Sequence, residues 1–248
     1  MLAAERQAKI VELTMRRGSV QVEELAQELK VSSMTIRRDL VKLEEENKLE
    51  RCHGGAVAKQ EELYADKQIS HKKEKESLAR RCLDYMKEGD TIFLDAGTTT
   101  YEIAKHMKGM KDLSVVTNDL EIAQLLKDSE VELFVCGGRV QKETGSMFER
   151  YATQMLEDFK FDVGFFGAAC INNEFEVMTP TQTKMWLKRY TPVRCEKAYL
   201  VVDASKFGKQ AMTRINHLGD FNGVITDKIF TAQEKERLNK LGAVIISE

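Results

Sequence analysis

The sequence has little proline, a single tryptophan and no long apolar run. Two prolines occur among its 248 residues, and both stand at the edges of predicted helices. No stretch of about 18 apolar residues is present, so a membrane span is not expected. Residues 1–15 carry charges where a signal peptide needs an apolar core. We therefore expect a cytoplasmic protein with no membrane partner.

Cysteine is scarce and has no regular spacing. The five cysteines are an odd number, and no two have the spacing of a zinc knuckle. Cys82, Cys136 and Cys170 lie in apolar surroundings, which predicts buried small hydrophobic residues, with a redox or metal-binding role as the alternative. The sequence also lacks a Walker loop, a Ser-His-Asp order and a cluster of metal ligands. We expect no metal site and no cofactor.

Neither sign of charge dominates the chain. The 38 Lys and Arg and the 40 Asp and Glu residues give a net charge of −2. Nucleic-acid binding would therefore have to come from a local patch, because no global field supports it. With 42% hydrophobic and 31% charged residues, the composition is that of a soluble globular protein. This composition excludes long disorder, collagen and a small disulfide-stapled protein.

Residues 1–57 show the periodicity of helices. Apolar residues recur at spacings of three and four within 10–14, 22–29 and 36–43. Short breaks separate these segments. Residues 49–57 then predict two short strands joined by Gly54-Gly55. The pattern indicates a three-helix unit followed by a small β-wing.

From about residue 90 the pattern changes to strands that alternate with helices. Such alternation predicts an α/β domain whose mostly parallel sheet is covered on both faces. We therefore expect an N-terminal domain of residues 1–57, a polar linker of 58–75 and an α/β domain of 76–248. The predicted strands cover 90–95, 113–118, 131–138, 162–168, 197–203, 223–227 and 243–247.

Residues 22–40 have the spacing of a helix–turn–helix. In this motif about three residues join two helices, and the second helix lies in the major groove of DNA. Ser32 is placed to cap the second helix by accepting hydrogen bonds from its first free N–H groups. Ser33, Met34 and Thr35 follow in the first turn, where base edges are usually approached.

The predicted second helix carries a basic face. Arg37 and Arg38 diverge by about 100°, so one can face bases while the other faces phosphate, and Lys42 lies on the face of Arg38. Asp39 is expected to pair with an arginine or to orient it. The alternative is an ordinary three-helix unit with a solvated basic face. Residues 1–60 hold 11 Lys and Arg and 10 Asp and Glu, so DNA binding should be localised and salt-sensitive.

This N-terminal stretch resembles the DeoR family of bacterial repressors. The resemblance implies a winged helix–turn–helix that binds double-stranded operator DNA, with Arg51 and His53 of the wing as further contacts. Cys52 departs from the family, which commonly has Thr or Val there. The residues that carry the resemblance are Val31-Ser32, Thr35-Ile36-Arg37-Arg38-Asp39-Leu40, Leu43-Glu44, and Arg51 with His53-Gly54-Gly55-Ala56.

A second group of polar residues follows the strand predicted at 90–95. Gly97 lets backbone N–H groups approach an anion, and Thr98, Thr99 and Thr100 add hydroxyl donors where a helix begins. The dipole of that helix favours negative charge at the same point. This arrangement predicts a phosphate cradle, with a simply capped helix start as the alternative. Several other predicted strands also end in polar or glycine residues, and ligands gather at such ends in open α/β sheets.

The α/β domain resembles the sensor domain of the same family, which is related to ribose-5-phosphate isomerase and the CoA-transferase group. The motifs that carry the resemblance are DAGTTT, VVTN, Gly137-Gly138, FDVGFFGA and VDASKFG. It implies a phosphorylated sugar as ligand, with Asp95 accepting from sugar hydroxyls, the 97–100 turn holding phosphate and Lys206 offsetting its charge. By matching position, the expected pocket residues are Asp95, Gly97, Thr98, Thr99, Thr100, Asn118, Gly138 and Lys206.

Residues 171–190 depart from the family pattern. Val177 and Met178 occupy the region where a turn glycine is expected. The basic residues of this segment either add anion contacts or form a solvated face. They are Lys184, Lys188 and Arg189.

Together these features predict a repressor of a carbohydrate uptake or catabolism operon, controlled by a phosphorylated sugar. We expect a homo-oligomer, a dimer or tetramer, because one reading helix covers only a few base pairs. The alternative is a sugar-phosphate isomerase with an accessory DNA-binding domain. Isomerisation needs a carboxylate base beside the reacting carbons, whereas Ala168, Ala169 and Cys170 follow Gly167. We therefore expect no enzymatic activity.

Overall fold

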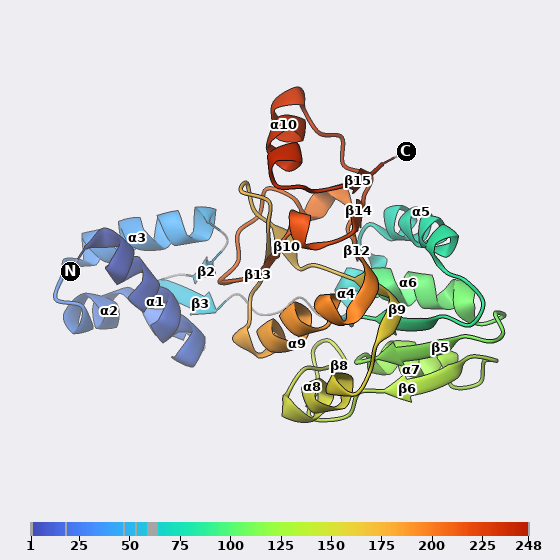
Figure 1. Ribbon diagram of the computed structural model, residues 1–248. Coiled ribbons are helices and arrows are strands. Elements are labelled where there is room, and N and C mark those ends of the chain that lie inside the picture. Colours follow the sequence, from blue (N-terminus) through green and yellow to red (C-terminus); the bar gives the residue numbers. More distant parts are fainter. Residues whose placement is uncertain (1, 18, 47, 53, 59–63, 248) are drawn as a thin grey trace. The chain divides into compact units, whose positions relative to one another are not determined.

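The computed structural model describes residues 2–17, 19–46, 48–52, 54–58 and 64–247. The chain forms two compact units. The N-terminal unit comprises residues 1–61 with 209–212, and the C-terminal unit comprises 62–208 with 213–248. Figure 1 labels their helices and strands in chain order.

The N-terminal unit is a winged helix–turn–helix. Its core is formed by the predicted apolar positions, among them Ile10, Leu25, Ile36, Leu40 and Leu43, each at most 1% exposed. The wing strands pair with a third, short strand that the sequence pattern did not predict, in the antiparallel order β1-β3-β2. The elements are α1 (Ala3–Arg17), β1 (Ser19–Gln21), α2 (Val22–Glu28), α3 (Ser33–Glu45), β2 (Leu49–Cys52) and β3 (Gly55–Ala58).

Glycine is required where β3 meets β1. A Cβ atom at Gly55 would lie 2.0 Å from the carbonyl oxygen of Val20. Any side chain at this position would push the strands apart, so the second glycine of the wing turn allows the three-stranded pairing.

A parallel sheet of seven strands forms the centre of the C-terminal unit. The strand order is β15-β14-β12-β9-β4-β5-β6, and every adjacent pair is parallel. This confirms the predicted α/β class with a parallel sheet. The strands are β4 (Thr91–Leu94), β5 (Ser114–Thr117), β6 (Glu132–Val135), β9 (Phe161–Phe166), β12 (Cys195–Val201), β14 (Gly223–Ile225) and β15 (Ile245–Ile246).

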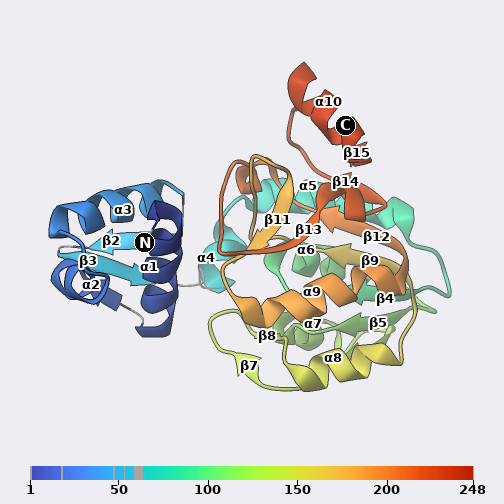
Figure 2. The same cartoon turned by 60° about the vertical axis from the view of Figure 1, so that its left-hand side comes forward.

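Helices cover both faces of this sheet. On one face α5 (Lys72–Cys82), α6 (Thr98–Met107) and α7 (Leu120–Leu126) pack over a core that includes Ile92 and Leu94. On the other face α8 (Arg150–Glu157), α9 (Met185–Tyr190) and α10 (Ala232–Lys240) pack over a core that includes Phe93. Figure 2 shows these helices around the strands of the sheet.

Two small antiparallel sheets lie beside the main sheet. One is the hairpin of β7 (Val140–Gln141) and β8 (Ser146–Met147). The other joins β10 (Cys170–Ile171), β11 (Glu176–Thr179) and β13 (Thr213–His217) in that order. The divergent segment 171–190 therefore includes β11, the short 3-10 turn Gln182–Lys184 and α9.

Part of the segment predicted as a linker is helical. Residues Tyr64–Ile69 form α4, and α5 begins at Lys72, so α4 and the first turn of α5 lie within the predicted 58–75 linker. The segment has no apolar period because α4 buries none of its residues fully.

Cys82, Cys136 and Cys170 are buried, as their apolar surroundings predict, whereas Cys52 is exposed. Burial raises the pKa of Cys136 to about 12, which keeps its thiol protonated at neutral pH. None of the helices in the described part of the chain is long and apolar enough to cross a membrane.

Candidate functional site

The second helix of the helix–turn–helix begins at a side-chain cap. Ser32 has an extended backbone, and its Oγ accepts a hydrogen bond from the backbone N–H of Thr35 at 3.1 Å. Ser33 and Thr35 are half-buried in the first turn, while the side chain of Met34 is 58% exposed. The sequence prediction of the cap is therefore confirmed, and Met34 presents an apolar side chain to the solvent.

The basic side chains of α3 lie on its exposed surface. Arg37, Arg38 and Lys42 are all exposed. Arg37 lies 3.7 Å from Glu23 and Lys42 lies 3.9 Å from Glu46, at distances and exposures where ion pairs contribute little. These three cations can therefore exchange their present neighbours for phosphates without a large penalty.

Asp39 is buried and pairs with α1 rather than with the arginines of its own helix. Its carboxylate accepts hydrogen bonds from Arg6 at 2.5 and 3.2 Å and from Gln7 at 2.9 Å. The expected pairing with an arginine is correct, but the partner lies 33 residues away. Asp39 therefore fixes α3 against α1 and leaves Arg37 and Arg38 outside this network.

The wing places Arg51 beside the end of α3. Its backbone N–H donates to Glu44 at 3.1 Å, and its guanidinium lies 3.4 Å from the same carboxylate. His53, the other wing residue expected to contact DNA, lies outside the described residues.

In the C-terminal unit the strand order reverses between β4 and β9. From β4 the chain adds β5 and β6 on one side and then β9, β12, β14 and β15 on the other. The carboxyl ends of adjacent strands diverge at such a point, and ligands bind there in open α/β sheets. Asp95 follows β4 and Gly167 follows β9, so both residues lie at this switch point.

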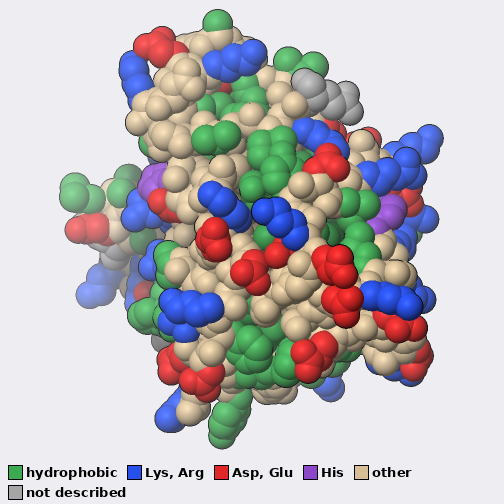
Figure 3. All heavy atoms as spheres, turned by 45° about the vertical axis from the view of Figure 1, so that its right-hand side comes forward, with side chains coloured by type: hydrophobic (Ala, Val, Ile, Leu, Met, Phe, Trp, Pro, Cys, Tyr) green, Lys and Arg blue, Asp and Glu red, His purple; other side chains and the backbone are tan. Residues whose placement is uncertain are grey.

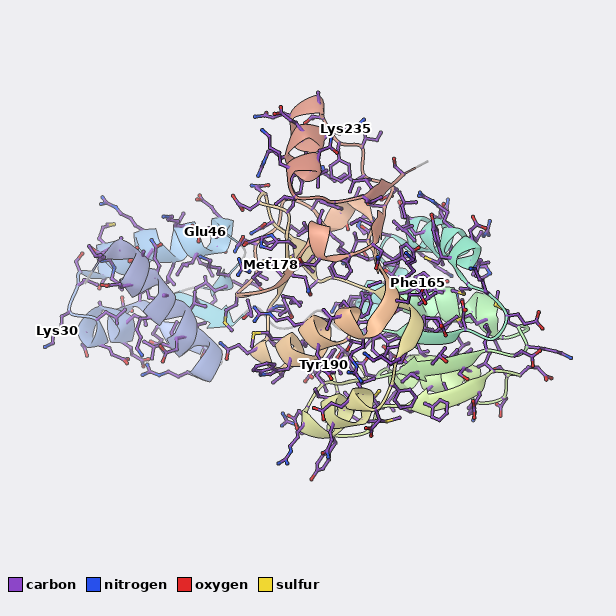
Figure 4. The ribbon with its side chains drawn as sticks, in the orientation of Figure 1. Lys30, Glu46, Phe165, Met178, Tyr190 and Lys235 are labelled. Carbon is purple, nitrogen blue, oxygen red and sulfur yellow. The ribbon has the colours of Figure 1, made fainter. Side chains whose placement is uncertain are left out.

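A buried ion pair occupies the switch point. The Nζ atom of Lys188 pairs with Oδ2 of Asp95 and donates to the carbonyl oxygen of Gly167 at 3.1 Å. Asp95 is fully buried and Lys188 is 9% exposed. Lys188 comes from α9, which ends at Tyr190 (Figure 4).

One carboxylate oxygen of Asp95 accepts no hydrogen bond from the described residues. Oδ2 also accepts from the backbone N–H of Gly167 at 3.2 Å, but Oδ1 has no hydrogen-bond partner among the described residues. Burial raises the pKa of Asp95, and the charge of Lys188 opposes that rise. Asp95 can therefore accept one further hydrogen bond from a donor that enters the site.

The turn after Asp95 is tied to the end of β5. The backbone N–H of Gly97 donates to Asp119 at 3.0 Å, and that of Ala96 donates to Asn118 at 3.0 Å. The hydroxyl of Thr100 donates to the carbonyl oxygen of Asp95 at 2.6 Å. Gly97 and Thr100 of the expected phosphate cradle thus already have partners within the chain.

Asn118 and Asp119 hold neighbouring segments together. Both are fully buried. Asn118 also donates from Nδ2 to the carbonyl oxygen of Met147 at 3.0 Å. Asp119 caps α7 by accepting from Glu121 and Ile122, and burial raises its pKa to about 7. Asp119 is not among the expected pocket residues, although its place after β5 and before a helix is a usual signal of an N-cap.

The basic residues of segment 171–190 have separate surroundings. Lys184 and Lys188 are both buried, with their Nζ atoms 5.1 and 6.0 Å from the centre of the Phe148 ring. Burial, with a smaller effect of Lys188, lowers the pKa of Lys184 to about 7. Arg189 instead donates to the carbonyl oxygens of Arg214 and Ile215 at 2.6 and 3.0 Å. Arg189 is exposed and connects α9 to β13 through these two bonds.

Gly138 and Lys206 lie at the same edge of the sheet, further from Asp95. Gly138 follows β6 with a φ of 141°, close to Tyr151 and Ala152 of α8. Lys206 ends a short 3-10 turn, Ala204–Lys206, after β12 and is half-buried. The structure brings Asp95, Gly97, Thr100 and Asn118 into one hydrogen-bonded group.

The charges on the surface of the molecule are mixed in sign. Acidic and basic side chains are interspersed over the face of the molecule drawn in Figure 3, so that face presents no field of one sign. Among the described residues, no group of three His, Cys, Asp or Glu side chains could hold a metal ion.

Comparisons with known proteins agree with this two-part architecture. Residues 6–62 match the DeoR-like helix-turn-helix domain, and residues 70–228 match the DeoR C terminal sensor domain. A solved structure of ribose 5-phosphate isomerase A from Methanocaldococcus jannaschii is similar to 56% of this chain and 55% of its own, with 15% identity and a TM-score of 0.42.

Several curated relatives match over nearly their whole length. The HTH-type transcriptional regulator GlpR of Haloferax volcanii is 32% identical over 99% of this chain and 98% of its own. The lactose phosphotransferase system repressor of Streptococcus mutans is 33% identical over 97% of each chain. The glycerol-3-phosphate regulon repressor of Escherichia coli is 30% identical over 92% of each chain. This chain therefore belongs to the DeoR family of transcriptional regulators, with an N-terminal helix–turn–helix domain and a C-terminal sensor domain.

Proposed function

We propose that this regulator represses an operon for carbohydrate uptake or catabolism and that a phosphorylated sugar sets its affinity for operator DNA. Relatives of about the same length are named as repressors of a lactose phosphotransferase system and of a glycerol-3-phosphate regulon. Their names support a phosphorylated carbon source as the effector and a repressor as the type of regulator.

The observation that carries the proposal is the Asp95–Lys188 pair at the switch point of the sheet. A buried charge pair is stabilised only where further hydrogen bonds satisfy the remaining lone pairs, and Oδ1 of Asp95 has none among the described residues. A sugar hydroxyl is a donor of the right kind. A phosphate, which only accepts when fully ionised, is not, so Asp95 would bind the polyol part of the ligand.

The phosphate part would lie at the start of α6. This helix has ten residues, and its first N–H groups have no partner within the helix. Thr98 and Thr99 add hydroxyl groups there, while Gly138 and Lys206 flank the same edge of the sheet. In this proposal Asn118 and Thr100 position the turn rather than contact the ligand.

The DNA-binding role belongs to α3 and the wing. Ser32, Ser33, Met34 and Thr35 would approach base edges, while Arg37, Arg38 and Lys42, with Arg51 and His53 of the wing, would contact bases or phosphates. One helix covers only a few base pairs, so we propose that two or more copies, a dimer or tetramer, bind repeated half-sites. The protein would act in the cytoplasm, where its operator and effector occur.

Effector and operator must then be coupled through two arrangements of the same chain. A ligand changes DNA affinity only if it binds one arrangement better than the other. Coupling of about 1–3 kcal/mol, or about 5- to 150-fold in affinity, is usual for such regulators.

The proposal is tested by separating the two binding functions. A thermal-shift screen would use glycerol 3-phosphate, glucose 6-phosphate, fructose 1-phosphate, galactose 6-phosphate and inorganic phosphate. A ligand at 100 times its Kd should add about 2.7 kcal/mol of stability. Operator binding to the upstream region of the gene would be measured with and without each ligand that shifts the melting temperature.

Two variants should lose one function each. Arg38→Ala should lose specific operator binding and keep the thermal shift, whereas Lys9→Ala, which removes a cation from α1, should keep both. Thr98→Glu should lose the thermal shift, because it adds negative charge at the start of α6, and should keep basal operator binding. Full operator affinity in Arg38→Ala, or a normal ligand response in Thr98→Glu, would contradict the corresponding assignment.

A further inference from the structure

Tyr64, the first residue of α4, contacts two other elements of the C-terminal unit. Its backbone N–H donates to the carbonyl oxygen of Glu143 in the β7–β8 hairpin at 2.9 Å. Its ring meets that of Tyr101 on α6 edge to face, with centroids 6.3 Å apart. Tyr64 therefore contacts both the hairpin and the helix whose first turn would hold the phosphate.

The hydroxyl of Tyr64 is buried without a hydrogen-bond partner among the described residues. Burial, followed by the negative charges of Asp119 and Glu121, raises the pKa of this phenol, so it remains a protonated donor. The hairpin that Tyr64 contacts also bridges to Asp119 at Ser146. A buried unsatisfied hydroxyl is costly, and an arrangement in which it can donate is accordingly favoured. Tyr64 thus favours any rearrangement that brings an acceptor to it.

Asp119 is the acceptor best placed to change partner. Its Oδ1 accepts from Glu121 and Ile122, while its Oδ2 accepts from the N–H of Gly97. Gly97 is also the first residue of the turn at which the phosphate would bind. A phosphate oxygen that takes the Gly97 N–H would free Oδ2 of Asp119, and the nearby phenol could then donate to it.

We propose that Tyr64 is the coupling residue of this regulator: effector phosphate takes the Gly97 N–H from Asp119, Asp119 accepts from the Tyr64 hydroxyl, and α4 moves with it. This inference rests on the proposed function, because it needs an anion at the 97–100 turn. Each exchange keeps one donor with one acceptor, and the unpartnered hydroxyl gains its bond only in the effector-bound arrangement. Because α4 lies within the predicted 58–75 linker, its movement changes the tether of the DNA-binding unit.

The test compares Tyr64→Phe with Tyr85→Phe in the full-length chain. Tyr85→Phe also removes a phenol hydroxyl. Tyr85 packs against Tyr199 and precedes β4, so it lies on the amino side of that strand, away from the carboxyl ends of the strands, where the ligand would bind. The measured quantity is the ratio of the operator affinity without ligand to that with ligand. The ligand is the sugar phosphate that gives the largest thermal shift in the screen described above. A hydrogen bond to a charged group formed only in the bound arrangement should change this ratio about tenfold.

Tyr64→Phe is expected to keep wild-type operator affinity without ligand and to move the ratio about tenfold closer to one, while Tyr85→Phe keeps the wild-type ratio. An unchanged ratio in Tyr64→Phe overturns the coupling role and leaves the proposed function standing. If no sugar phosphate alters operator binding by the wild-type chain, the proposed function fails and the coupling role fails with it.

The route through Asp119 has its own test. Asn is as good an N-cap as Asp, so Asp119→Asn should fold, but its amide cannot replace Oδ2 as acceptor for the phenol. The double variant Tyr64→Phe/Asp119→Asn should lose no more of the ratio than Asp119→Asn alone, because both changes remove the same bond. If the effects of the two single substitutions on the ratio add up in the double variant, the proposed hydrogen bond between Tyr64 and Asp119 is overturned.

Discussion

Two buried carboxylates, Asp95 and Asp119, follow adjacent strands of the same sheet but have different partners. Among the described residues, Asp95 pairs with a lysine and keeps one oxygen without a partner, whereas Asp119 accepts from backbone N–H groups. Charge in the first case is balanced by an ammonium group. In the second case it is balanced by backbone dipoles. Burial is the largest effect on both groups and raises the pKa of each.

Lys188→Met should destabilise the C-terminal unit by about 3–5 kcal/mol at pH 7, because it leaves the buried charge of Asp95 without its partner. The deficit should shrink as the pH is lowered, because burial raises the pKa of Asp95 and protonation removes the unpaired charge. Urea unfolding at pH 7 and pH 5 would measure both effects. Lys240→Met, at an exposed site of α10, should change stability by less than about 0.5 kcal/mol. Equal stability of the two variants would contradict a buried pair.

Asp119 should make unfolding depend on pH. Its pKa is raised to about 7, so its contribution to stability is complete below pH 4 and is lost as the pH rises toward and above 7. The free energy of unfolding of the wild type, relative to Asp119→Asn, should therefore fall by about 2–4 kcal/mol from pH 4 to pH 8. Urea unfolding of both chains across this range would check the sign. A constant difference would show that the carboxylate ionises normally.

At this scale the sequence predicts residue types better than it predicts contacts. Asp95 and the threonines after it follow from the strand–glycine–helix pattern. The partner of Asp95 lies 93 residues away, in a segment that departs from the family. Nothing in the local pattern of Lys184, Lys188 and Arg189 could indicate which of the three would meet the carboxylate, because that depends on how α9 docks on the sheet.

Among the elements, α3 is attached to α1 by a buried ion pair in addition to the apolar core that the two helices share. Asp39→Ala should cost the N-terminal unit about 3 kcal/mol, since it leaves Arg6, whose side chain is only 12% exposed, without its carboxylate. Operator binding should weaken with the loss of folded protein. Chemical unfolding followed by far-UV circular dichroism would measure the change.

The matched control for Asp39→Ala is Glu23→Ala. Glu23 also lies beside an arginine, but that pair is about 60% exposed on both sides, so its removal should have almost no effect on stability. Similar losses in both variants would show that burial of the Asp39 pair has no special importance.

The long periodic elements are predictable from the sequence, and the short ones are not. The three helices of the N-terminal unit and the alternation of strands and helices in the sensor domain follow from apolar spacing. β1 has three residues, too few for any period, and it depends on pairing with β3. α4 has no buried residue that could reveal it, and long-range contacts such as those of Tyr64 with Glu143 and Tyr101 hold its first turn.

At the scale of the whole molecule, the same type of sheet edge could serve a sensor or an isomerase. We expect no interconversion of ribose 5-phosphate and ribulose 5-phosphate by the purified chain. The carboxylate of Asp95 is held by Lys188, and Gly167 is followed by residues that cannot act as a carboxylate base. Proton NMR of the substrate mixture over hours would detect exchange or turnover. Turnover above that of a Lys188→Met control would favour the isomerase alternative.

The DNA-binding region has an almost even charge balance, with 11 basic and 10 acidic residues in positions 1–60. Unspecific attraction to duplex DNA grows with the number of phosphates that a protein neutralises, so bulk chromosome would retain this regulator poorly. A cell could then keep an operator filled with few copies of the protein, since little of it would be sequestered elsewhere. A change in sugar supply would accordingly alter promoter occupancy directly, because few molecules of the regulator would be bound nonspecifically elsewhere on the chromosome.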